Sequence, residues 1–341
     1  MRGLKSKGLA LWAAGLPLLI AQSVWSAAPT PADPWLRPAQ APAPEHNLPT
    51  PDRVNLGKAL FFEPRISGSG FLSCASCHNP SLGWSDGMAT GLGHDFKRLG
   101  RATPTVLNTA FQPLLMWDGR KNSLEEQALG PIESPGEMNM PLDELVKRLN
   151  AIAGYKPLFE KAYPGEPISK ETVGKALASY ERTLLSTTSP FDLWRQGKAN
   201  AISESAKRGF DLFNDKANCA KCHQGFNFTD NGFHNIGVKS LSDTEDEGRF
   251  AHRKVKVLKG AFKTPTLRDV ELTAPYMHNG IYKTLEEVVD HYDRGGDVTT
   301  NLSPNMKPLN LSAQEKADLV AFMKSLTGPQ IKVELPSLPP Q

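Results

Sequence analysis

A five-residue motif occurs twice in the chain and constrains its fold more than any other feature. Residues 74–78 and 219–223 both read C-x-x-C-H, and together they use all four cysteines. Two thiols at this spacing can each form a thioether with one vinyl group of the same porphyrin, and the next residue can bind its iron. We therefore predict two covalent haems c, with zinc sites or a pair of disulfides as the alternatives. The predicted attachment residues are Cys74, Cys77, Cys219 and Cys222, and the predicted iron ligands are His78 and His223.

Residues 1–27 have the pattern of a secretory signal peptide. A basic start is followed by an apolar stretch that reaches Val24 and then by small residues. Gly15 and Pro17 interrupt this stretch, and it is short for a bilayer span. We expect a cleaved signal rather than the alternative, a membrane anchor, and no stable membrane span elsewhere. Because haem c is attached outside the cytoplasm, the expected location is the periplasm.

The charge balance argues against binding to nucleic acid or to an anionic membrane. The chain has 39 Lys and Arg residues against 36 Asp and Glu residues, a net charge of +3. Arg2, Lys5 and Lys7 lie in the predicted signal, which contains no acidic residue. The mature polypeptide is therefore expected to be near neutral.

Helical spacing and sparse strand signals predict an all-α chain, and the helix before the second C-x-x-C-H motif, as in class I cytochromes c, indicates two cytochrome c-like domains. We expect a loose Pro/Ala-rich arm at 28–51, an N-terminal domain at 52–195 and a C-terminal domain at 196–330. Capping-box patterns predict helix starts at Ser123, Thr284 and Ser312. The other expected elements are a helix at 52–62, an end of the Ser123 helix at Gly130-Pro131, helical spacing at 141–163 and 170–186, a linker at 189–199 and a helix from Ser203.

Ten short stretches between about residues 51 and 327 resemble the bacterial dihaem cytochrome c peroxidases and their MauG relatives. Together they are far more specific than either haem motif alone. They are residues 60–62 (LFF), 74–78, 104–108 (PTVLN), 117–120 (WDGR), 126–128 (EQA), 130–132 (GPI), 135–138 (PGEM), 219–223, 265–268 (PTLR) and 276–280 (YMHNG).

The resemblance implies a division of labour between the two haems. The haem held by His78 would react with H2O2, and the haem held by His223 would exchange electrons. Trp117 resembles the tryptophan between the haems, and Gln127 and Glu137 resemble the polar pair on the peroxide side. A carboxylate can move the proton that O–O cleavage requires, and an amide can orient the peroxide. The alternatives are a core tryptophan, a helix-surface glutamine and a solvated glutamate.

Two further positions concern the iron ligands. His94 matches a histidine that, in the peroxidases, binds the first haem at rest and leaves on activation; the alternative is a surface histidine. Tyr292 stands where the peroxidases have methionine and the MauG proteins have tyrosine. Methionine raises a haem potential, whereas the charge of a tyrosinate favours higher oxidation states. The alternative is that Tyr292 only packs on its helix.

A calcium ion between the haems is a further possibility that the resemblance raises. Thr273 and Pro275 match carbonyl donors of that site, but the Asn donor of the family falls at Ala102. Calcium prefers several oxygen ligands, so this departure weakens the expected site.

The sequence thus predicts a periplasmic dihaem peroxidase-type oxidoreductase that reacts with H2O2. Its electron donor would be a small c-type cytochrome or another redox protein, or the side chain of a partner protein oxidised as by MauG. A dihaem electron carrier without peroxide chemistry is the alternative from another class. Gln127 and Glu137 argue against a carrier, which needs no acid–base pair.

Overall fold

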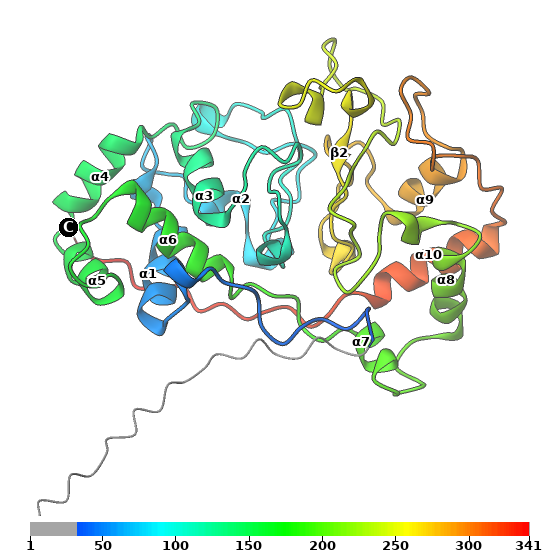
Figure 1. The fold of residues 1–341 in the computed structure, drawn as a ribbon, viewed down its shortest axis with the longest axis horizontal. Helices are drawn as coiled ribbons and strands as arrows, with labels where there is room; N and C mark the ends of the chain where they lie inside the picture. The colour runs from blue at the N-terminus through cyan, green and yellow to red at the C-terminus, as the bar shows by residue number, and fades with distance from the viewer. Residues whose placement is uncertain (1–32, 341) are drawn as a thin grey trace, which may run out of the picture.

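The computed structural model describes residues 33–340, so the predicted signal peptide and the first residues of the arm lie outside the described part. The chain forms two helical lobes side by side (Figure 1). Within the described residues, no helix is long and apolar enough to cross a bilayer. The N-terminal lobe contains α1 (Pro51–Phe61), α2 (Cys74–Cys77), α3 (Leu124–Glu133), α4 (Leu142–Ala151), α5 (Tyr155–Ala162) and α6 (Lys170–Glu181). The C-terminal lobe contains α7 (Pro190–Arg195), α8 (Glu204–Asn214), β1 (Phe233–His234), β2 (Phe262–Lys263), α9 (Leu285–Asp293) and α10 (Ala313–Ser325).

The all-α prediction is confirmed, because the described sheet consists of two antiparallel strands of two residues each. In each lobe a glycine allows two long helices to cross closely. A Cβ atom on Gly57 of α1 would lie 1.9 Å from the carbonyl oxygen of Ala176 on α6. A Cβ atom on Gly209 of α8 would lie 2.0 Å from the carbonyl oxygen of Asp318 on α10. Larger residues at either glycine would force the helices apart.

The predicted helix starts are confirmed, whereas several predicted ends are wrong. Ser123, Thr284 and Ser312 each accept a hydrogen bond from the backbone three residues on. Helix α3 does not end at Gly130-Pro131 but continues to Glu133. Pro131 lacks only the N–H that would bond to Gln127, and burial of Ile132 in the core helps to offset this loss.

Three other elements differ from the predicted ranges. Residues 141–163 form two helices, because Ile152 adopts an extended conformation between α4 and α5. Helix α6 ends at Glu181, and the predicted linker contains α7, which Ser189 caps. Hydrophobic spacing alone could not separate α4 from α5, since both helices contribute buried residues to one core.

The prediction of a loose arm is wrong for its described part. Trp35 packs edge-on against Phe210 in the C-terminal lobe, with ring centroids 5.4 Å apart. Asn47 is fully buried in the N-terminal lobe, where its amide donates to Glu125 at 2.8 Å. The C-terminal tail crosses back in the same way (Figure 1), and the Pro339 carbonyl accepts a hydrogen bond from Arg65 at 2.8 Å. Both ends of the described chain therefore hold the two lobes together.

The lobes repeat a local structure at a constant offset of 161 residues (277 − 116 = 161). Met116 and Met277 both have a φ of 72°, and the glycines three residues later have φ values of 66° and 65°. The N-caps Ser123 and Thr284 are also 161 residues apart.

The repeat pairs Trp117 with His278 and Ala102 with Lys263. Two reciprocal hydrogen bonds join these pairs across the lobes: Ala102 N–H to the His278 carbonyl (2.7 Å) and Lys263 N–H to the Trp117 carbonyl (2.8 Å). The lobes thus meet with pseudo-twofold symmetry.

Candidate active site

A continuous cavity of about 740 Å³ lies between the lobes and reaches both C-x-x-C-H motifs. Its walls are mainly apolar and come from both lobes. The predicted site residues that line it are Cys74, Cys77, His78, Trp117, Gln127, Glu137, Cys219, Cys222, His223, Thr273, Pro275 and Tyr292. The fold therefore brings together residues that are more than 200 positions apart in sequence.

The two motif histidines have the same arrangement. Nδ1 of His78 lies 3.2 Å from the Trp84 carbonyl, and Nδ1 of His223 lies 2.9 Å from the Phe228 carbonyl. Each Nδ1 therefore donates its proton to a carbonyl, which leaves Nε2 as a lone-pair donor. Burial lowers the pKa of both imidazoles and keeps them neutral. This is the donor set that an axial haem ligand requires.

The four cysteines are unpaired and half-buried beside these histidines. Burial raises the pKa of the Cys77 thiol to about 11, and the charges of Asp86 and Glu137 act in the same direction. The first motif therefore holds the protonated thiol of Cys77 next to a neutral imidazole. The residues present fit thioether-bound haem at both ends of the cavity, and none of the four cysteines forms a disulfide.

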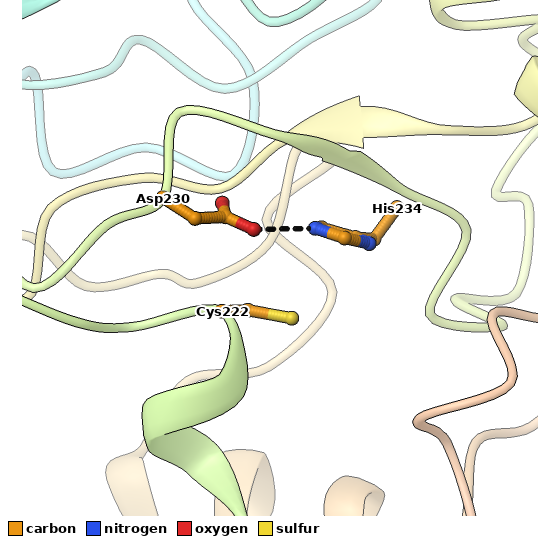
Figure 2. Close-up of side chains that lie close together, drawn as sticks. All are labelled: Cys222, Asp230 and His234. Carbon is orange, nitrogen blue, oxygen red and sulfur yellow. Dashed lines mark hydrogen bonds and ion pairs between the residues drawn. The ribbon is translucent and has the colours of Figure 1, made fainter.

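Within the described residues, one cluster could compete for a metal ion: Cys222, Asp230 and His234 (Figure 2). His234 Nε2 lies 2.8 Å from Asp230 Oδ2. Hydrogen bonds to Cys222 and Asp230 raise the pKa of His234 to about 9. Because the second haem motif already uses Cys222, the cluster is better explained as an interaction between His234 and Asp230 beside that motif.

Glu137 and Gln127 lie near the first motif. The carboxyl group of Glu137 is close enough to Cys77 for its charge to affect that thiol. Burial raises the pKa of Glu137, while Ser134 and Arg120 act in the opposite direction. Gln127 Nε2 lies 3.7 Å from the Met116 sulfur, which positions the amide at the cavity wall. A carboxyl with a raised pKa can both take and return a proton near neutral pH.

Helix α9 presents Tyr292 to the second motif. Burial raises the pKa of the phenol, and the charges of Cys219 and Cys222 act in the same direction. By the offset of 161, Tyr292 corresponds to Pro131 on α3, and both line the cavity. A prolyl ring has no ligand atom for iron, whereas a phenol has one. Equivalent helices therefore place an inert side chain near the first motif and a possible ligand near the second.

Trp117 lies at the junction of the lobes. Its indole Nε1 donates to the Ala102 carbonyl at 2.9 Å, and its own carbonyl accepts from Lys263. The next residue, Asp118, is buried and binds Arg101 at 2.6 Å and Arg120 at 2.7 Å. Burial tends to raise the pKa of Asp118, but the two arginines outweigh it and hold that pKa below its usual range. The indole is thus fixed between the two motifs.

His94 does not line the cavity, although its neighbours Leu92 and Gly93 do. Its backbone N–H donates to the Gly136 carbonyl at 3.1 Å, and its Nε2 lies 3.5 Å from Asp95. A role as an iron ligand would require this loop to rearrange, and that role stays a prediction.

The calcium site also stays a prediction. Thr273 and Pro275 line the cavity, but Ala102 has no side-chain oxygen and its carbonyl already accepts a hydrogen bond from the Trp117 indole.

Sequence reasoning missed two buried residues of the cavity wall, Glu181 and Lys263. Burial raises the pKa of Glu181 to about 8, with Glu125 adding to the shift and Arg182 opposing it. The offset of 161, had it been measured, would have directed attention to Lys263 as the partner of Ala102.

Comparison with known proteins identifies the family. The family model described as "Di-haem cytochrome c peroxidase" matches residues 51–200, and a cytochrome c model matches residues 206–327. The chain is 50% identical over 304 residues to a methylamine utilization protein MauG of Methylorubrum extorquens, covering 89% of this chain and 86% of the relative. The chain belongs to the dihaem cytochrome c peroxidase and MauG family. It is therefore a dihaem peroxidase-type oxidoreductase with haem c as its cofactor.

Two further similarities agree with this assignment. The chain is 46% identical over 326 residues to MauG of Methylophilus methylotrophus, covering 94% of this chain and 96% of the relative. The crystal structure of a MauG-like protein associated with microbial copper homeostasis superimposes with a TM-score of 0.79 at 32% identity, covering 87% of this chain and 95% of that one.

Proposed function

We propose that this family member is a periplasmic oxidant of the MauG type, which uses H2O2 to oxidise a side chain of a partner protein. The observation that carries the proposal is the contrast between Pro131 and Tyr292 at equivalent positions of α3 and α9. Pro131 would offer no ligand atom to an iron held by His78, whereas the oxygen of Tyr292 would be available to an iron held by His223. When bound, the two haems c supply the redox-active iron at these positions.

The residues of the chain supply the proton transfers. Glu137 takes a proton from the oxygen of H2O2 nearer the iron and returns it to the leaving oxygen, while the amide of Gln127 orients the peroxide. Over the complete reaction, H2O2, two protons and two electrons yield two molecules of water. Trp117 would provide a path for electrons between the two haems, because its indole is readily oxidised and is fixed in the cavity wall between the motifs.

The second candidate is a peroxidase that takes the same electrons from a small c-type cytochrome. The matching family model supports this reading as well as the first. A peroxide-consumption assay separates the two, with either a reduced small cytochrome or a candidate partner protein as the only reductant. The proposal predicts loss of two hydrogen atoms from the partner per H2O2 and slow oxidation of the cytochrome. Rapid cytochrome oxidation with an unmodified partner would favour the second candidate.

The cofactor content can be measured directly. We expect mass spectrometry of the denatured mature protein to show two haem additions, because thioether bonds survive unfolding. Replacing Cys219 and Cys222 by serine should leave one addition and one motif. A wild-type protein with a single haem, or with a free thiol pair, would contradict the proposal.

Substitution of Trp117 by phenylalanine should slow electron transfer between the two haems. The ring keeps most of its packing but loses the bond to Ala102 and the easily oxidised indole. After addition of H2O2, we expect spectral changes at the first haem and little change at the second. Replacement of Trp194, a tryptophan in the C-terminal lobe outside the cavity wall, is the matched control. Wild-type behaviour of Trp117→Phe would remove the indole from the electron path.

A further inference from the structure

Lys263 is a buried lysine at the junction of the two lobes. It lies at the end of β2, and only 7% of the residue is exposed. Its ammonium group donates to Gln112 Oε1 of the other lobe at 2.9 Å. An ammonium has three N–H donors, and within residues 33–340 no other acceptor is bonded to this one. Lys263 lines the cavity, and two donors of its buried ammonium group have no protein partner among the described residues.

Each of the other lysine and arginine side chains in the cavity wall forms an ion pair with a carboxylate or is exposed to solvent. Arg101 binds Asp118 and Asp246, at 2.6 and 2.7 Å. Arg120 also binds Asp118, and Lys307 is exposed. No Asp or Glu oxygen of the described residues lies within 4.0 Å of the Lys263 ammonium.

A buried cation without a nearby anion is costly. Burial lowers the pKa of Lys263 to about 8, and the charge of Asp230 only partly opposes this. The missing anion should therefore be part of a group that enters the cavity.

We propose that Lys263 binds a propionate carboxylate of the haem attached at the second motif. This inference rests on the proposed pair of haems, each of which has two propionate carboxylates that would need a partner when the cavity is filled. The residues that follow Lys263 run along that motif. The Thr264 carbonyl accepts the Thr229 hydroxyl at 2.7 Å, and the backbone of Pro265 lies against the His223 ring.

The interaction belongs to one lobe only. The position equivalent to Lys263 in the N-terminal lobe is Ala102, which carries no charge. A fixed cation beside one haem favours its ferrous form, because reduction removes a positive charge from the iron. The Lys263 backbone also holds the carbonyl of Trp117. The lysine thus joins the second haem, Gln112 of the other lobe and the inter-haem tryptophan.

Three variants of the holoprotein test the proposal. Lys263→Gln removes the charge but can still bond to Gln112, Lys263→Arg keeps the charge, and Lys307→Gln removes an exposed charge from the same cavity wall. Haem content is measured first by mass spectrometry, since absence of two haems from the wild type would count against the proposed function instead. A potentiometric titration then follows the ferric-to-ferrous equilibrium of each haem.

We expect Lys263→Gln to shift the second haem about tenfold toward the ferric form, because a partly buried charge is poorly screened. In the same variant, the shift at the first haem should be smaller. Lys307→Gln should shift the second haem by less than about twofold, because water and salt screen an exposed charge. Lys263→Arg should leave the second haem largely unchanged. An unchanged second haem in Lys263→Gln would overturn the proposal. Loss of a haem from both Lys263 variants would also overturn it, because it would assign the lysine a packing role.

A crystal structure of the wild-type holoprotein gives an independent test that needs no variant. The Lys263 ammonium should lie within about 3.2 Å of a propionate oxygen of the second haem. A separation beyond hydrogen-bond reach from every propionate oxygen would refute the assignment.

Discussion

Glu137→Gln should react with H2O2 about 10²–10⁴-fold more slowly than the wild type while retaining both haems, since a general acid–base group typically contributes this much. Glutamine has nearly the same shape and can occupy the same half-buried position, but it cannot accept and return a proton. Stopped-flow absorption after mixing with H2O2 measures the rate. The matched control is Glu133→Gln, an exposed glutamate at the end of α3 that does not line the cavity.

The pH profile gives a second readout for Glu137. Burial raises the pKa of this carboxyl above its ordinary value. Because the first proton transfer needs the carboxylate, the rate should rise with pH through that raised pKa and then level off. The Glu137→Gln variant should lack this rise. Equal rates and equal pH profiles in the two proteins would exclude Glu137 from the proton transfers.

Tyr292→Met should change the oxidation state in which the enzyme reacts with peroxide. A phenolate ligand lowers the potential of the second haem, whereas a thioether raises it. We expect the all-ferric wild type to react with H2O2 directly, at both haems. The Met variant should have a higher potential at the second haem and should need prior one-electron reduction. Its ferric form should therefore be nearly inert.

Tyr292→Phe serves as the comparison, because it keeps the ring and removes only the ligand oxygen. Met variants at Tyr276, which also lines the cavity but precedes α9, control for a general effect of methionine. The spectra of both haems are recorded after mixing the ferric proteins with H2O2. If the ferric wild type is inert and becomes active only after half-reduction, Tyr292 does not act as proposed. Movement of the His94 loop would then be the better explanation of activation.

Local features of the fold were predictable because short-range interactions determine them. The N-caps at Ser123, Thr284 and Ser312 depend on a hydroxyl three residues before a backbone N–H. The C-x-x-C-H spacing places two thiols and an imidazole together without help from the rest of the chain. The ends of the helices were less predictable, since α3 continues past Pro131 to Glu133 with Ile132 buried in the core.

Long-range packing determined the arrangement of the site. The arm at 33–50 is ordered because its Trp35 and Asn47 find partners in different lobes, and no local pattern encodes those partners. The place of His94 outside the cavity wall likewise depends on the contact between Gly93 and Gly136.

The amino-acid sequence by itself determined the haem motifs, the helical class and the side chains available for peroxide chemistry, because these depend on residue type and near spacing. Only the tertiary structure decided that both motifs open into one cavity, that Tyr292 and Pro131 both line it, and that Lys263 is buried there without a carboxylate. These features arise where two pseudo-symmetric lobes meet, and the reciprocal hydrogen bonds of Ala102 and Lys263 join residues far apart in the chain. Such contacts between distant parts of the chain depend on how the surfaces of the two lobes pack against each other.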